Sequence, residues 1–215
     1  MNTSLEAVDT LRPGHVGGGF PFKVIGGREA PHSGPHPHAY VVSGPSFVGK
    51  TTLGRKLKRM LARHSPRRTC LVELPTLRRM IGPVTWDGTE DRLAYSLLLS
   101  MTWQALDLGM NIVAVAPGGE EIARLFRGEP VLANATQIQV RCSLDTVLAR
   151  QQQVLSSNRR AYVGAVRLRE IHEAYRYCPL PWVGSVLEFD SERDSSRKLM
   201  SLLRESVAGD LVVVR

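Results

Sequence analysis

The sequence predicts a three-layer α/β domain in which helices cover both faces of a mainly parallel, five-stranded sheet. From residue 39 onward, short β-branched runs alternate with segments of helical periodicity, which is the pattern of β-α units. The chain has 215 residues, of which 43% are hydrophobic, so a single domain can bury a continuous core.

The first 38 residues differ in composition from the rest of the chain. They contain seven glycines and four histidines and show little apolar periodicity. Because such a segment buries too little apolar surface to offset the entropy of ordering, we expect residues 1–38 to be a disordered Gly/Pro/His-rich tail and residues 39–215 to form the domain. His32, His36 and His38 allow a transient metal contact, but a solvated segment is the simpler interpretation.

The elements of the domain follow from the apolar pattern. The candidate strands are at 39–43, 69–73, 111–116, 137–142 and 185–190, with 211–215 as a further candidate edge strand. Helices are predicted at 51–64 and at about 90–108, 144–156, 166–177 and 195–207. Leu53, Leu57 and Leu61 share one face of the first helix. Ser143 is placed to cap the third helix, and Gly109 to close the second.

Composition excludes several classes of protein. No window holds the roughly 18 consecutive apolar residues that a membrane span requires, and the first residues lack the features of a signal peptide. We therefore expect a cytoplasmic protein that does not associate with a membrane. The cysteines Cys70, Cys142 and Cys178 are far apart and lack metal-ligand spacing, so neither a disulfide framework nor a zinc site is expected.

The formal net charge of +8 raises the question of a nucleic-acid partner. In residues 1–38 the basic and acidic residues are equal in number. The excess of positive charge lies in the rest of the chain, which has 25 basic and 17 acidic residues. No aromatic residues alternate with the basic ones as a stacking platform for bases would need. The sequence therefore argues against nucleic acid and leaves homodimer formation open.

One motif carries the functional prediction. The segment VVSGPSFVGKTTL contains the pattern G-x-x-x-x-G-K-[ST], with Gly44, Gly49, Lys50 and Thr51 at the defined places. A strand ends just before the motif and a helix begins within it, so the loop amides and the helix dipole converge where a polyphosphate would lie. The predicted cofactor-binding residues are Gly44, Pro45, Ser46, Phe47, Val48, Gly49, Lys50, Thr51 and Thr52.

The motif predicts a P-loop NTPase fold that binds a nucleoside triphosphate with Mg²⁺. Lys50 would contact the β- and γ-phosphates, and the Thr51 hydroxyl would coordinate the metal. The base-reading and switch motifs of a GTPase, N-K-x-D and D-x-x-G, do not occur in the sequence. The segment NIVAVAPGG lacks the acidic residue that a motor would carry after this strand.

The chain resembles the small P-loop kinases, the group that contains adenylylsulfate kinase, chloramphenicol phosphotransferase and the polynucleotide-kinase-like enzymes. The resemblance spans about residues 39–207 and rests on the phosphate loop, LVELPTLRRMI, DLGMNIVAVAP and RCSLDTVLARQQQ. It implies an acid after the second strand that takes the proton of the acceptor hydroxyl, and an arginine that holds the acceptor. Glu73 and Arg78 are the nearest matches, although Glu73 is displaced by two positions from the family's spacing. Glu90 and Asp91 are the substitutes for the base.

The resemblance also implies a lid whose arginines close over the transferring phosphate. Arg150, Arg159 and Arg160 occupy that stretch, and Arg150 is the preferred candidate. Arg124 stands where several such kinases carry an acceptor-facing arginine. The expected catalytic residues are thus Lys50, Glu73 and Arg150, with Arg78 and Arg124 binding the acceptor and Thr51 the metal.

We expect a kinase that transfers the γ-phosphoryl group of ATP to a hydroxyl of a small metabolite or antibiotic. A nucleotide-dependent binding or regulatory module with little catalysis is the first alternative, because the general base is displaced. A polynucleotide 5′-hydroxyl kinase is the second. The sequence does not identify the acceptor.

Overall fold

The computed structural model describes residues 37–82, 89–117, 135–157, 164–177 and 185–206. The chain divides into two units, Met1–Gly34 and Pro35–Arg215, and all described residues belong to the second. Residues 1–36 of the predicted tail (1–38) and the candidate edge strand at 211–215 lie outside the described residues.

Five parallel strands form one sheet, as the sequence predicts. They are β1 (Ala39–Ser43), β2 (Thr69–Glu73), β3 (Asn111–Val115), β4 (Ala135–Arg141) and β5 (Ser185–Asp190). Their order across the sheet is β2-β3-β1-β4-β5, so β1 is central and its neighbours are not its neighbours in sequence. Ligands of open parallel sheets bind outside the carboxyl ends of the strands, where such an order changes direction.

The helices follow the predicted positions, with one addition. They are α1 (Lys50–His64), α2 (Leu74–Ile81), α3 (Thr89–Asp107), α5 (Leu144–Ser157), α6 (Ala165–Tyr177) and α7 (Ser196–Ser206). The sequence analysis did not predict α2, which follows β2 directly and has Pro75 in its first turn. The predicted end of α3 is confirmed, because Gly109 adopts φ +71 and Met110 N donates to Ala105 O at 2.8 Å.

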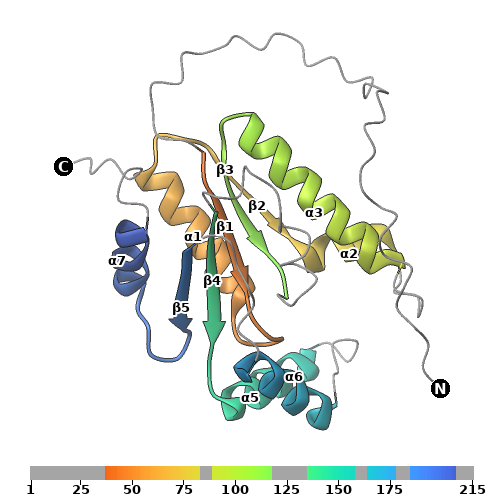
Figure 1. The fold of residues 1–215 in the computed structure, drawn as a ribbon. Helices are drawn as coiled ribbons and strands as arrows, with labels where there is room; N and C mark the ends of the chain where they lie inside the picture. Colours follow the sequence, from red (N-terminus) through yellow and green to blue (C-terminus); the bar gives the residue numbers. More distant parts are fainter. Residues whose placement is uncertain (1–36, 83–88, 118–134, 158–163, 178–184, 207–215) are drawn as a thin grey trace. The chain divides into compact units, whose positions relative to one another are not determined.

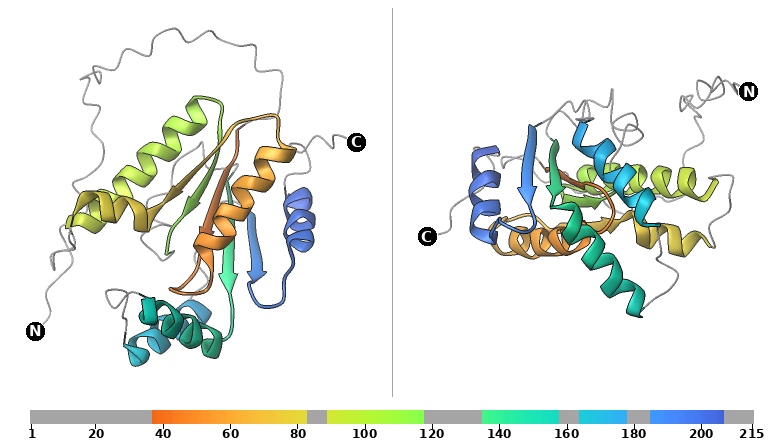
Figure 2. Two further views of the ribbon diagram at one scale, coloured as in Figure 1. Left: turned by 180° about the vertical axis from the view of Figure 1, so that it is seen from behind. Right: turned by 90° about the horizontal axis from the view of Figure 1, so that it is seen from below.

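Two apolar layers enclose the sheet, and alternate residues of β1 point into each of them. Ala39 and Val41 face the layer made with α2 and α3. Tyr40 and Val42 face the layer made with α1, α5, α6 and α7. Figure 2 shows α1 and α3 on opposite sides of the sheet. The three-layer architecture of the prediction is therefore confirmed.

The carboxyl ends of the strands meet at one edge of the sheet (Figure 1). β4 leads there into α5, and α6 lies beside α5. The loop between β1 and α1 lies at the same edge because β1 is parallel to its neighbours. The fold thus brings the predicted phosphate loop next to α5.

His38 differs from the expectation of a solvated tail residue. Its imidazole is buried, with Nε2 at 2.8 Å from Thr136 Oγ1, and its amide donates to Asn111 Oδ1 at 3.0 Å. His38 therefore anchors the start of β1 between β3 and β4. Among the described residues, no helix combines the length and apolar character needed to cross a bilayer.

Gly54 allows α1 to approach the sheet closely, which suggests a stability test. A Cβ atom at Gly54 would overlap Cγ2 of Val115, a β-branched side chain that is fully buried in β3. We expect Gly54→Ala to lower the free energy of unfolding by about 1–3 kcal/mol, the usual range for overpacking, despite the better helix propensity of alanine. Chemical denaturation monitored by circular dichroism measures the change.

Gly164 provides the matched control. A Cβ atom there would meet no heavy atom within 4 Å, so Gly164→Ala should cost at most the roughly 0.5–1 kcal/mol of a poorer N-cap for α6 and no overpacking. Equal stability of the Gly54→Ala and wild-type proteins would contradict the close packing of α1 on β3.

Candidate functional site

The phosphate loop leaves β1 at Gly44 in a conformation that favours glycine. Gly44 has φ +144, and a Cβ atom there would lie 2.5 Å from the carbonyl oxygen of Val140. Its amide donates to Pro117 O at 3.1 Å, which links the start of the loop to the end of β3. The loop ends at Gly49, which caps α1 without a side-chain hydrogen bond. The first amides of α1 therefore lack a side-chain cap and face the loop.

Lys50 turns back across the loop. Its Nζ donates to Pro45 O at 2.5 Å. Desolvation by the surrounding protein lowers the pKa of Lys50 from 10.5 to about 8. A cation held in this way, with few partners and little water, is suited to a polyphosphate ligand that would restore the lost solvation.

Thr51, the predicted metal-binding residue, follows Lys50 in the first turn of α1. Within the described part of the chain, its hydroxyl makes no hydrogen bond, so the oxygen is available to an incoming ligand. A single hard oxygen donor beside a phosphate site suits Mg²⁺, which keeps most of its ligands as waters and phosphate oxygens. The described residues contain no group of three His, Cys, Asp or Glu side chains that could hold a metal ion.

Arg150, the preferred lid candidate, lies against the phosphate loop. Its Nη1 donates to Val48 O at 2.9 Å, to Phe47 O at 3.3 Å and to Ser191 Oγ at 3.0 Å. The same nitrogen lies 3.8 Å from Cys142 Sγ, so its contacts are with the backbone of the loop, with the residue after β4 and with the segment after β5. The other predicted lid arginines, Arg159 and Arg160, lie outside the described residues.

The candidate base Glu73 forms a bidentate ion pair. Arg55 of α1 donates from Nε to Glu73 Oε1 at 2.8 Å and from Nη2 to Oε2 at 3.1 Å. The Thr76 hydroxyl donates to Oε2 at 3.3 Å. The Glu73 side chain is 10% exposed, whereas that of Arg55 is 59% exposed, so the carboxylate is held at the carboxyl end of β2 by a solvated partner. Sequence reasoning missed Arg55, although it lies one helical turn after Thr51.

The other acceptor-site candidates pair with one another. Arg78 Nε lies 2.6 Å from Asp91 Oδ1, and the Arg78 guanidinium lies 5.8 Å from the ring centroid of Tyr95. This pair joins α2 to α3. Glu90, the other substitute base, is buried at the start of α3. Arg124 lies outside the described residues.

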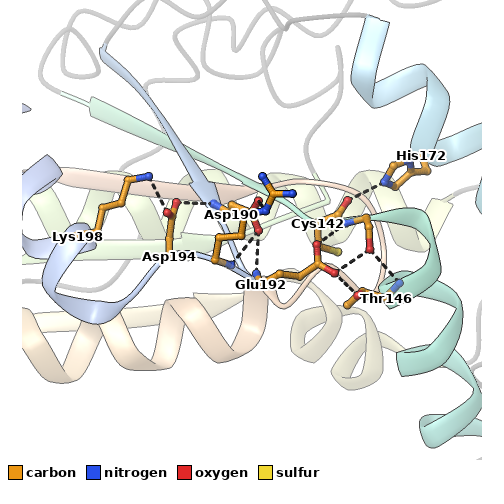
Figure 3. A network of polar contacts seen from close by, with 9 residues as sticks. Cys142, Thr146, His172, Asp190, Glu192, Asp194 and Lys198 are labelled. Atoms are coloured by element: carbon orange, nitrogen blue, oxygen red, sulfur yellow. Dashed lines mark hydrogen bonds and ion pairs between the residues drawn. The ribbon is translucent and has the colours of Figure 1, made fainter.

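The loop between β5 and α7 also contributes to the site, because its residue Glu192 reaches the start of α5 (Figure 3). The Glu192 carboxylate accepts hydrogen bonds from the Thr146 hydroxyl and from the amide and hydroxyl of Ser143, at 2.8 and 2.7 Å. These donors, with the Thr146 hydroxyl foremost, lower the pKa of Glu192 to about 2. Glu192 therefore shares the capping of α5 with Ser143, whose Oγ accepts from Thr146 N at 3.2 Å. Only the Ser143 cap was predicted.

A cavity of about 430 Å³ lies beside the phosphate loop. Its lining residues come from the loop, the end of β4, the start of α5 and the middle of α6: Gly44, Pro45, Val48, Gln139, Val140, Arg141, Cys142, Ser143, Leu144, His172 and Glu173. His172 Nε2 lies 3.0 Å from Cys142 O and fastens α6 to the end of β4. The cavity is lined by neither Glu73 nor Arg78, and the sequence analysis did not predict it.

Comparisons with solved structures support the fold assignment. A candidate kinase from Chloroflexus aurantiacus is similar with a TM-score of 0.64 and 18% identity, over 80% of this chain and 97% of that chain. A sugar kinase from Janibacter sp. is similar with a TM-score of 0.51 and 16% identity, over 81% of this chain and 96% of that chain. A shikimate kinase from Acinetobacter baumannii in complex with shikimate is similar with a TM-score of 0.51 and 16% identity, over 80% of this chain and 94% of that chain.

At these identities the similarity concerns the fold, and the prediction of a P-loop kinase fold is confirmed. No protein-family model and no curated protein sequence matches the chain.

The lowered pKa of Lys50 gives a pH-dependent prediction. In the ligand-free protein the ammonium loses its proton as the pH rises through about 8, whereas a bound triphosphate would stabilise the charged form. The affinity for ATP with Mg²⁺ should therefore be nearly constant below that pH. Above it, affinity should fall by up to about tenfold per pH unit. Titration calorimetry at several pH values measures this dependence.

The Lys50→Met protein is the control, because it should bind more weakly and with little pH dependence over the same range. A wild-type affinity that does not change up to about pH 9.5, where a lysine with an unperturbed pKa of roughly 10.4 remains charged, would contradict the desolvation of Lys50.

Proposed function

We propose that this protein is a kinase that transfers the γ-phosphoryl group of ATP to a hydroxyl of a small molecule. The observation that carries the proposal is the phosphate loop, with the desolvated ammonium of Lys50, at the carboxyl edge of a sheet with the kinase fold. Phosphoryl transfer depends chiefly on positioning and charge neutralisation, and the loop supplies the groups for both.

The nucleotide half of the site is the β1–α1 unit. Lys50 would leave Pro45 O and contact the terminal phosphates, while the loop amides bind their oxygens. Thr51 would hold Mg²⁺, which supplies further neutralisation of the phosphate charge when bound. Waters and oxygens of the triphosphate would complete the ligand set of the metal, so a single protein oxygen would suffice.

Glu73 is the proposed base that receives the proton of the acceptor hydroxyl. Its carboxylate has about four lone-pair positions, of which Arg55 uses two and Thr76 one. The ion pair therefore orients the carboxylate and leaves a lone pair for the acceptor.

The proposed acceptor is a small hydroxylated metabolite or antibiotic. A cavity of about 430 Å³ beside the loop has the size of a small-molecule site, but its lining lies on the β4 side of the phosphate loop and includes neither Glu73 nor Arg78. An acceptor that gives its proton to Glu73 would therefore lie outside this cavity, near the carboxyl ends of β2 and β3. Arg78 remains a proposed acceptor contact only if the acceptor displaces Asp91 from its guanidinium.

The central test is a screen of ATP consumption against nucleosides, sugars, aminoglycosides and a 5′-hydroxyl oligonucleotide, with mass spectrometry of the products. We expect one small molecule to gain the mass of a phosphoryl group. The Lys50→Ala protein serves as the blank and should lose nearly all turnover, because its charge no longer stabilises the transferring group.

Three results would refute the proposal. Equal turnover by both proteins would show that another site or a contaminant is responsible. Phosphorylation of the oligonucleotide would show that the acceptor is a polynucleotide and not a small molecule. Tight binding of ATP without any phosphorylated product would indicate a regulatory module.

A second prediction addresses the base. Glu73→Gln keeps the shape of the side chain but removes its basicity, so kcat should fall by roughly 10²- to 10⁴-fold while the affinity for ATP changes little. Steady-state kinetics with the acceptor from the screen measures both. Glu170→Gln, on the exposed face of α6 and paired only with Arg167 among the contacts described, is the matched control. An unchanged kcat in Glu73→Gln would transfer the role to Glu90 or Asp91.

A further inference from the structure

We propose that Arg150 is a positioning residue that fixes the direction of two peptide groups in the phosphate loop. This inference rests on the proposed function, because it assigns the way in which the loop is prepared for a triphosphate. The sequence analysis expected Arg150 to contact the transferring phosphoryl group directly. In the present proposal Arg150 acts on the phosphate site indirectly, by orienting the backbone of the loop.

The contacts of one nitrogen carry the inference. Arg150 Nη1 lies 2.9 Å from Val48 O and 3.3 Å from Phe47 O, two consecutive carbonyl oxygens of the loop. The same nitrogen lies 3.0 Å from Ser191 Oγ. Cys142 Sγ lies 3.8 Å away, and because Nη1 carries only two hydrogens, these partners use its full donor capacity.

Peptide geometry converts these contacts into a statement about the phosphate site. In a trans peptide the carbonyl and the following N–H are coplanar and point in opposite directions. When Arg150 holds Phe47 O and Val48 O on its own side, the N–H groups of Val48 and Gly49 must point away from it. Lys50 Nζ contacts Pro45 O and so joins the end of the loop to its start. In the proposal, the side of the loop away from Arg150, which the two amides face, is the side on which phosphate oxygens would bind.

The loop needs such support because its backbone is strained at the same point. Phe47 has φ +63, a left-handed conformation that a side chain with a Cβ atom disfavours. The hydrogen bond to Phe47 O and the neighbouring one to Val48 O hold this turn. Strained residues of this kind persist where the surrounding structure fixes them.

The guanidinium is itself held in place. Ser191 supplies one contact, and the Glu192 carboxylate, which caps α5 on the same side, interacts favourably with its charge. Arg150 therefore connects the phosphate loop, α5 and the β5–α7 loop through a single side chain. The planar, permanently charged group suits this role, since a lysine ammonium would present a compact point charge instead.

The test compares binding with turnover in Arg150→Met. If Arg150 orients the loop amides, the Kd for inorganic tripolyphosphate and for ATP should rise by roughly tenfold to a hundredfold, the effect of losing one well-directed bond to a charged group. If Arg150 instead contacts only the transferring group, kcat should fall and both Kd values should remain unchanged. Titration calorimetry with Mg²⁺ present, followed by single-turnover kinetics, separates the two results.

Two further variants complete the test. Ser191→Ala removes one anchor of Nη1 and should raise the tripolyphosphate Kd a few-fold in the same direction, and it decides the question if Arg150→Met does not fold. Arg63→Met, the same change at the exposed last turn of α1, should leave binding unchanged. Wild-type affinity in Arg150→Met and Ser191→Ala would overturn the inference. Failure of the wild-type protein to bind ATP would instead refute the nucleotide site itself.

Discussion

The backbone leaves the central strand β1 at Gly44, in a left-handed conformation and so near to β4 that a Cβ atom would lie 2.5 Å from Val140 O. This turn sets the path of the next five residues. β1 lies between β3 and β4, and the turn follows its carboxyl end, so the turn lies at the carboxyl edge of the sheet. Helix α1 then runs back along one face of the sheet. The position of every other group in the site follows from this path.

The cations of the site already have partners in the ligand-free protein. Lys50 contacts Pro45 O, Arg150 contacts the loop carbonyls, Arg55 contacts Glu73, and Arg78 contacts Asp91. These partners differ in strength. A neutral carbonyl holds Lys50, whereas a carboxylate holds Arg55 and another holds Arg78, and bonds between charged groups are the stronger ones. An incoming polyphosphate therefore competes most easily for Lys50, which is also the group whose charge is least well solvated.

The sequence predicted the phosphate loop and most element boundaries because both depend on local patterns. A loop of eight consecutive residues and a strand such as β1 or β5 are each encoded within a short window. Helix α2 was missed because eight residues are short for a helix and Pro75 stands near its start, although Leu74, Leu77 and Ile81 have helical spacing. The partners of Glu73, Arg78 and Arg150 were not predictable, since each contact joins long side chains from separate elements whose distance depends on packing.

The capping of α5 shows how distant parts of the chain determine the shape of the loop. Ser143 alone would cap this helix, yet Glu192 adds a carboxylate that reaches it from the segment after β5. The first turn of α5 is thereby fixed relative to the β5–α7 loop, and Arg150 lies one turn further along the same helix. Displacement of the β5–α7 loop would move Ser191 and Glu192 together and change the surroundings of Nη1. In this proposal the orientation of the loop amides therefore depends on three parts of the chain packed together, the phosphate loop, α5 and the β5–α7 loop, although the motif that identifies the loop occupies only one connection between a strand and a helix.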